Sequence, residues 1–160
     1  MNHLMLDNQQ AVSEWVGLKL NTRFSNLLGT VGYLDKEGTL IGAAVLHDHT
    51  KYDVELTYFG KGTLSLDMCK AIAWLSFIRG NVLRVSICVP RKKKQLRIGF
   101  EKIGWRYEGI KHRYFGPSKN CDGIMYWFSR YDATKFLRGK DGKRSESTRS
   151  SQDSERSANL

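Results

Sequence analysis

Apolar and polar residues alternate along the chain with two spacings, one typical of helices and one typical of strands. Helical spacing predicts a first helix with the apolar stripe Val12, Trp15, Val16 and Leu20, and further helices over residues 66–79 and 91–100. Alternating or continuous apolar runs predict strands over residues 28–34, 39–47, 52–59, 82–89, 105–115 and 121–130. This order of elements predicts an α/β protein, with a mixed central sheet and helices on both of its faces.

Short polar signals mark where these elements begin and end. Asn8 or Asp7 can cap the first helix, because a side-chain oxygen there can accept an unpaired backbone N–H. Gly38 closes a hairpin turn, and Gly104 follows a helix at the C-cap position. Both glycines are therefore expected to adopt a positive φ.

Two segments carry apolar residues on nearly every side. The helix over residues 66–79 has little polar surface, so we expect it to be largely covered by the sheet. The run over residues 82–89 is almost continuously apolar, which is typical of a central strand covered on both faces. By contrast, Trp105 and Tyr107 alternate with charged residues, and this pattern predicts a half-buried strand.

A chain of 160 residues with 41% hydrophobic residues can bury one substantial core. We therefore expect a single folded domain over residues 1–137. Residues 138–160 are rich in Ser, Lys, Arg, Asp and Glu and have almost nothing to bury, which predicts a disordered tail.

Composition also limits the compartment. No apolar run is long enough for a membrane span, and the first residues lack the pattern of a secretory signal. Cys69, Cys88 and Cys121 lie far apart in apolar segments, which favours free thiols over a disulfide framework. We therefore expect a cytoplasmic protein without a membrane partner. The sequence leaves the oligomeric state open, a homodimer included.

The formal net charge of +10 favours polyanionic partners such as nucleic acids, phosphorylated cofactors or acidic proteins. The run Arg91–Lys94 begins a predicted helix, where basic side chains oppose the helix dipole. It can be a solvated charge run, a site for cofactor phosphates or a contact to a nucleic-acid backbone. No aromatic residues interleave with it, which weakens the nucleic-acid interpretation.

The junction over residues 58–65 is the best candidate for phosphate binding. Gly60 and Gly62 allow backbone N–H groups to approach a ligand, and Lys61 adds a positive charge. A helix capped by Ser65 or Thr63 follows directly. The alternative is an ordinary glycine-containing loop, which is the commoner case for this short pattern.

Candidate acid–base groups lie on the predicted strands. Glu55 is in the middle of a strand, where a carboxylate is unusual; it can act as a general base or face solvent. Tyr107, Tyr114 and Tyr126 can each supply a general acid, although tyrosine is also common in strands.

His47 and His49 flank Asp48 and can face the same side of one strand. Two imidazoles at this spacing are a candidate metal pair, but the sequence offers no third ligand at matching spacing. We therefore predict no metal site.

The segment LRIGFEKIGWRYEG (residues 96–109) resembles a signature of GNAT-type N-acyltransferases, "EKxGF…EG". The likeness continues in order through other short segments. These are Asn8–Val12, Trp15–Val16, Leu40–Ala43, Val54–Thr57, Leu64–Ser65, Arg84–Val85, Arg113 and Asp122–Met125. The likeness covers about residues 8–132. Over this range the chain is similar to short GNAT-like proteins that bacteriophages often encode.

This resemblance implies the GNAT fold, with a V-shaped opening between the strands over residues 52–59 and 82–89 into which acetyl-CoA enters. The implied cofactor-binding residues are Leu56, Thr57 and Tyr58 for the carbonyl and pantetheine, Gly60, Lys61, Gly62, Thr63, Leu64 and Ser65 for the diphosphate, and Lys93 in the basic run. Glu55 matches an acidic position of the phage-encoded group, and we predict catalytic roles for Glu55 and Tyr107.

The chain departs from the family pattern at three places. Phe100 stands where GNAT enzymes often carry the tyrosine that protonates the leaving thiolate. Lys93 replaces an asparagine, and the loop at Gly60 lacks the leading Gln or Arg of the pyrophosphate motif. The resemblance as a whole implies an N-acetyltransferase that transfers an acetyl group from acetyl-CoA to an unidentified primary amine, whereas these departures favour an alternative. The alternative is a catalytically weak GNAT-fold binding protein, an accessory or virion-associated protein of a phage, that engages nucleic acid or an acidic protein.

Overall fold

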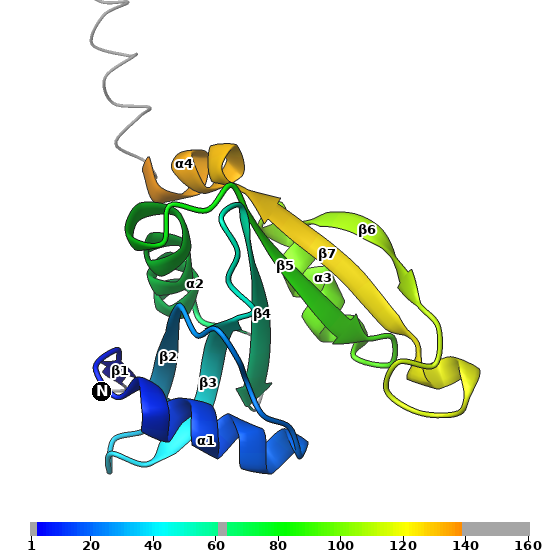
Figure 1. The fold of residues 1–160 in the computed structure, drawn as a ribbon, viewed down its shortest axis with the longest axis horizontal. Coiled ribbons are helices and arrows are strands. Elements are labelled where there is room, and N and C mark those ends of the chain that lie inside the picture. The colour runs from blue at the N-terminus through cyan, green and yellow to red at the C-terminus, as the bar shows by residue number, and fades with distance from the viewer. Residues whose placement is uncertain (1–2, 61–63, 139–160) are drawn as a thin grey trace, which may run out of the picture.

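The computed structural model describes residues 3–60 and 64–138. Within them, one mixed sheet has the strand order β1-β2-β3-β4-β5-β7-β6 (Figure 1). Its strands are β1 (His3–Met5), β2 (Gly29–Leu34), β3 (Leu40–His47), β4 (Asp53–Gly60), β5 (Arg84–Pro90), β6 (Arg106–Lys111) and β7 (Gly123–Ser129). Neighbouring strands are antiparallel except β4 and β5, which are parallel. The predicted mixed α/β fold is confirmed.

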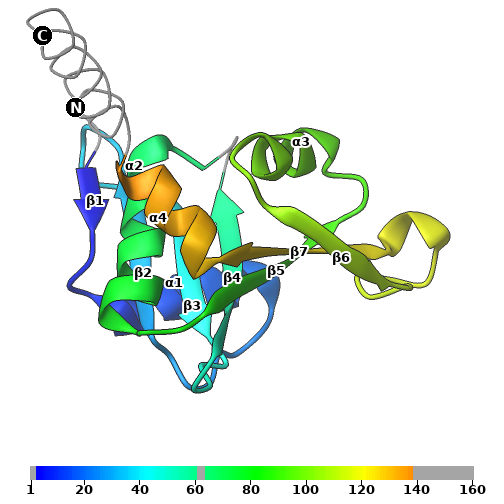
Figure 2. The ribbon, with the colours of Figure 1, turned by 90° about the horizontal axis from the view of Figure 1, so that it is seen from above.

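Helices cover both faces of the sheet, as predicted (Figure 2). The helical segments are α1 (Gln9–Leu20), α2 (Leu66–Ala73), the π-helical turn η1 (Trp74–Arg79), α3 (Lys94–Lys102), the 3₁₀ turn η2 (Lys119–Cys121) and α4 (Arg130–Arg138). Val12 and Val16 of α1 pack against Ala43 and Val45 on one face of β3. Helices α2, α3 and α4 pack in the larger core on the opposite face, where Leu46 and Leu56 point.

The predicted caps are present. The side chain of Asn8 accepts the N–H of Ala11 at the start of α1, and Ser65 accepts the N–H of Met68 at the start of α2. Gly104 has a φ of 99° after α3, and Gly38 has a φ of 80° in the β2–β3 turn. These caps could be predicted from the sequence because each one contacts backbone groups only a few residues away.

Four elements differ from what the sequence predicted. Strand β1 and helix α4 were not predicted, because each is short and gains its stability from packing against distant elements. Helix α3 begins at Lys94 rather than at residue 91. Strand β6 ends at Lys111 rather than at residue 115, where the chain turns.

The helical segment after Ser65 is less covered than expected. Leu66, Trp74 and Ile78 lie on its outer side with exposed fractions of 57%, 48% and 62%. Its second half also widens into the π-helical turn η1, which the sequence did not reveal. Only one side of this segment therefore faces the sheet.

Of the predicted disordered tail over residues 138–160, only Arg138 is described, and it ends helix α4 instead of lying in a tail. Residues 139–160 lie outside the described residues. Lys61, Gly62 and Thr63 of the predicted diphosphate loop lie outside them as well. None of the helices in the described part of the chain has the length and apolar character needed to cross a membrane.

Candidate active site

The central feature of the sheet is an opening between the two parallel strands. The β4–β5 ladder runs from the pair Asp53–Arg84 to the pair Leu56–Ile87 and ends there. Beyond it, β4 continues to Gly60 beside β3, while β5 stays paired with β7 up to Pro90. The two strands diverge below this point (Figure 1). Backbone groups of β4 that face the opening are available to a ligand in the way that a sheet edge is.

An apolar groove lies on the α2–α3 side of the sheet. It has a volume of about 370 Å³, and its walls include Leu64, Leu66, Cys69, Leu96 and Ile103. Burial raises the pKa of the Cys69 thiol to about 11, so this group is neutral near pH 7. Because its walls are largely apolar, the groove can hold a flexible, largely apolar part of a ligand. It offers no thiolate nucleophile at Cys69, because this thiol is neutral.

Glu55 lies on the other face of β4, near the point where the opening begins. It is half-buried, and its paired residues are His47 on β3 and Ser86 on β5. The charge of Glu55 also acts on the Cys88 thiol. Burial is the main reason that the pKa of Cys88 is raised; the charge of Lys111 lowers this pKa, and the charge of Glu55 raises it. Glu55 is thus a partly desolvated carboxylate at the opening, with polar neighbours on both adjacent strands.

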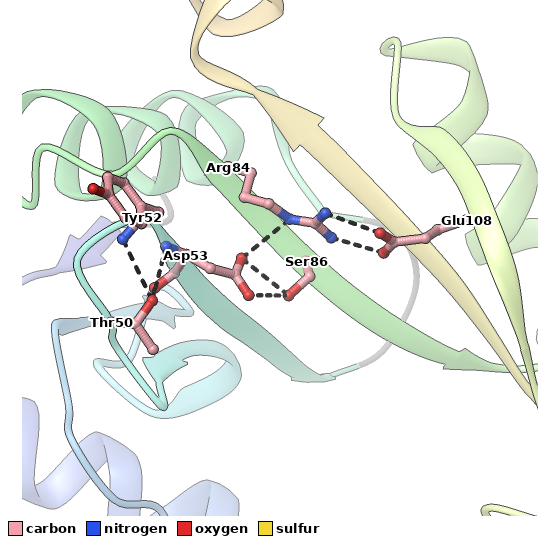
Figure 3. Close-up of polar contacts among 6 residues, drawn as sticks. All are labelled: Thr50, Tyr52, Asp53, Arg84, Ser86 and Glu108. Carbon is pink, nitrogen blue, oxygen red and sulfur yellow. Dashed lines mark hydrogen bonds and ion pairs between the residues drawn. The ribbon is translucent and has the colours of Figure 1, made fainter.

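A polar network lies where β4 and β5 are still paired, at the end of their ladder away from the opening (Figure 3). Arg84 donates two hydrogen bonds to Glu108, of 2.9 and 2.7 Å, and its Nε lies 3.4 Å from Asp53. The hydroxyl of Ser86 donates to the same Asp53 carboxylate at 3.3 Å. Hydrogen bonding to Arg84 is the main reason that the pKa of Glu108 is lowered. The network joins β4, β5 and β6 and holds in place the strands that diverge beyond it.

Sequence reasoning missed this network. Arg84 and Glu108 are 24 residues apart, and Ser86 and Asp53 are 33 apart. No spacing within the sequence signals such pairs, because only the strand register brings them together.

Solved structures with a similar fold include several of a polyamine acetyltransferase. Mutant forms of the spermidine/spermine N-acetyltransferase SpeG from Vibrio cholerae match with a TM-score of 0.65 at 12% identity, covering 84% of this chain and 98% of that chain. The complex of this spermidine N-acetyltransferase with CoA and spermine matches with a TM-score of 0.57 at 16% identity, covering 66% of this chain and 68% of that chain. Its dodecameric form in an intermediate state gives 0.62 at 14% identity, with 81% and 94% covered. No family model matches the sequence, and no curated protein does.

The chain has the GNAT fold. The opening between β4 and β5 agrees with the V-shaped opening that the sequence resemblance implied for these two strands. In this GNAT fold, Leu56 is buried on the groove side, and Thr57 and Tyr58 are half-buried beyond the last β4–β5 pair. The predicted pantetheine-binding backbone therefore faces the opening.

Only part of the predicted diphosphate loop is described. A Cβ on Gly60 would lie 2.8 Å from the Cα of Gly42 and 2.7 Å from the hydroxyl of Tyr58, so a glycine is needed for this close approach of β4 to β3. Leu64 lines the groove, and Ser65 uses its hydroxyl to cap α2. Binding of phosphate by these residues stays a prediction.

The two predicted catalytic residues do not meet. Tyr107 pairs with Tyr126 and packs edge-on against its ring, with centroids 6.4 Å apart, so it shares the face that carries α3. Glu55 shares the opposite face with Ser86, three strands from β6 in the sheet order. The phenol of Tyr107 is 59% exposed at the sheet edge. The structure thus separates the predicted base from the predicted acid.

The other tyrosine on this side is buried. Tyr126 donates its hydroxyl to Oε1 of Glu101 at 2.7 Å, and its ring stacks with Phe100. Burial is the main reason that the pKa of Tyr126 is raised, and the hydrogen bond to Glu101 adds to it. Phe100 is 2% exposed and fills the core, at the position where the sequence resemblance implied a tyrosine in GNAT enzymes.

Three residues of the basic run lie in the connection between β5 and α3, and the fourth, Lys94, begins α3. The side chains of the run are exposed, and Arg91 lies 3.5 Å from the buried carboxylate of Asp122 in the β6–β7 connection. Lys93 occupies the N-cap position of α3 and donates its backbone N–H to Pro90. Its side chain is exposed, and binding of cofactor phosphates or of nucleic acid by this run stays a prediction.

Proposed function

We propose that this protein is an N-acetyltransferase that transfers an acetyl group from acetyl-CoA to a primary amine. The observation that carries the proposal is the opening between β4 and β5, with an apolar groove on one face and the carboxylate of Glu55 on the other. An acyl donor and an amine acceptor can approach this opening from opposite faces of the sheet.

The described residues fit a bound acetyl-CoA. The β4 backbone at Leu56, Thr57 and Tyr58 would pair with the amide groups of its pantetheine arm, and the groove beside Leu64 and Cys69 would hold alkyl segments of that arm. Gly60, Ser65 and Lys93 would lie toward its phosphates. The bound group supplies an activated acetyl thioester. The neighbouring SpeG structure with CoA and spermine supports a donor and acceptor of this kind.

Glu55 has the chemistry to prepare the acceptor. An ammonium ion cannot attack a carbonyl, because its nitrogen has no free electron pair. A carboxylate at the opening accepts one proton and leaves a neutral amine, and such a base contributes about 10²–10⁴-fold to the rate. Tyr107, on the opposite face, keeps only the predicted role of a general acid, and Tyr107→Phe tests it separately.

Binding and transfer must be measured separately. We expect acetyl-CoA to stabilise the protein by about 2.7 kcal/mol at a concentration of one hundred times Kd, which thermal denaturation measures. Absence of any shift at millimolar acetyl-CoA would contradict the proposed function. Binding without transfer to a panel of primary amines would instead support the catalytically weak binding protein.

Glu55→Gln tests the proposed base. We expect the rate of transfer to fall by about 10²-fold or more, while the Kd for acetyl-CoA stays unchanged. Glu37→Gln is the matched control, because Glu37 is exposed in the β2–β3 turn and should leave both quantities unchanged. Equal turnover in Glu55→Gln and the wild type would exclude Glu55 from this role.

A further inference from the structure

The structure brings together a set of metal-binding groups that the sequence did not predict. His47, Asp48 and Glu55 each offer one ligand atom, and these three atoms lie within 4.8 Å of one another. His47 ends β3, Asp48 follows it, and Glu55 is the residue of β4 that pairs with His47. The ligand missing from the sequence pattern therefore comes from the neighbouring strand.

The imidazole of His47 is held as metal-binding histidines are held. It is 7% exposed, and its Nε2 lies 2.8 Å from Oγ1 of Thr57. When Nε2 carries the proton and donates it to Thr57, the free electron pair of Nδ1 points toward Asp48. In metal sites, a hydrogen bond from the ring nitrogen that does not bind the metal fixes the tautomer and orientation of the histidine ligand. The ring of Phe24, with its centroid 4.8 Å away, packs against the imidazole.

The three ligand atoms lie close enough together to share one small divalent ion. Nδ1 of His47 lies 3.0 Å from Oδ2 of Asp48, at hydrogen-bond distance, and an ion would replace the proton between these two atoms. A tetrahedral zinc ion with bonds of about 2.0–2.2 Å separates its ligands by about 3.4 Å. The side chain of Asp48 is 56% exposed and Glu55 is half-buried, so small side-chain rotations can bring both carboxylates to the ion. The exposed side leaves room for a water ligand.

We propose that His47, Asp48 and Glu55 form a binding site for a divalent transition-metal ion such as Zn²⁺. One imidazole nitrogen with two carboxylates favours such ions over Mg²⁺, which prefers oxygen ligands alone. This site does not depend on the proposed function. If the proposed function holds as well, a bound ion occupies the Glu55 carboxylate, and the metal then inhibits acetyl transfer.

His49, the second imidazole of the sequence pattern, is not part of the group. β3 ends at His47, and Asp48 adopts a φ of 49°, which ends the alternation of the strand. The backbone N–H of His49 donates instead to Asn26 in the loop after α1. His49 therefore provides a matched control within two residues of the proposed ligand.

Calorimetric titration of the full chain with Zn²⁺ alone tests the site. We expect one ion per chain, with affinity lowered by about 100-fold or more in both His47→Gln and Glu55→Gln. His49→Gln and Cys88→Ser should bind as the wild type does. Thr57→Val removes only the partner of Nε2, and loss of such a partner lowers metal affinity by about 10–100-fold.

Circular dichroism of each variant shows whether it is folded. If His47→Gln does not fold, Glu55→Gln still tests the site. Co²⁺ added to the wild type should give ligand-field absorption without a thiolate charge-transfer band. Three results would overturn the proposal: no binding at millimolar Zn²⁺, equal binding by Glu55→Gln and the wild type, or loss of binding in His49→Gln or Cys88→Ser.

Discussion

At the scale of single residues, the pair Tyr126–Glu101 shows how this chain places a phenol in its core. Tyr126 is 1% exposed, and its hydroxyl has a carboxylate partner at 2.7 Å. A buried hydroxyl is costly unless it is hydrogen-bonded, so Glu101 offsets the burial of the phenol. The same pair keeps the Tyr126 phenol in its protonated form.

Tyr126→Phe should therefore lower the free energy of unfolding by about 1–2 kcal/mol near pH 7. The raised pKa of Tyr126 adds a pH dependence: its contribution is fully present below about pH 10 and is lost as the pH rises through the pKa of the folded state. Urea denaturation at pH 7 to 11 measures both effects. Tyr52→Phe, at an exposed tyrosine, is the control, and equal alkaline loss in Tyr126→Phe and the wild type would contradict the assignment.

At the scale of elements, the parallel strands β4 and β5 are joined over only their first residues. The ladder ends at Leu56 and Ile87, and the Arg84 network lies at the paired end. Arg84 also lies over the ring of Trp127 on β7, 5.2 Å from its centroid. This residue therefore links four neighbouring strands on the side where no opening forms.

Glu108→Gln should remove the charge pair with Arg84 and lower the free energy of unfolding by about 0.5–1 kcal/mol, because the pair is partly exposed. The lowered pKa of Glu108 means that its contribution is present near neutral pH and is lost as the pH falls through the pKa of the folded state. A double-mutant cycle with Arg84→Met isolates the coupling. Additive effects of the two substitutions would mean that the pair contributes nothing.

At the scale of the whole molecule, α2 and α3 enclose a groove on one face of the sheet. The groove brings Cys69 of α2 next to Leu96 and Ile103 of α3, with the β4–α2 junction at one end. A ligand in the groove would contact both helices at once. The thiol of Cys69 thus reports on whether the groove is filled.

Alkylation of Cys69 by iodoacetamide should be slow at pH 8, since a pKa of about 11 leaves roughly 0.1% of the thiol ionised. Acetyl-CoA should slow it further by covering the groove, while Cys121, in the β6–β7 connection, should react at an unchanged rate. Mass spectrometry of the alkylated peptides measures both rates. Equal protection of the two cysteines, or of neither, would contradict binding in this groove.

Much of the fold could be predicted because its signals are local. Asn8, Ser65, Gly38 and Gly104 mark element ends through contacts or φ values within a few residues, and apolar spacing gives the helices and strands between them. The order of these elements, together with the resemblance of residues 96–109 to a GNAT signature, was enough to predict the GNAT fold. The α/β class and the fold were therefore determined by the sequence alone.

Tertiary structure decided which side chains meet. Glu55 joins His47 because those residues pair across β3 and β4, while Tyr107, also a predicted catalytic residue, lies on the opposite face of the sheet. A shift of one residue in strand register reverses the face of every side chain, and nothing local in the sequence fixes that register. The sequence alone thus determined the elements and their order, whereas the opening beside Glu55 and the groups around it depend on contacts between residues far apart in the chain.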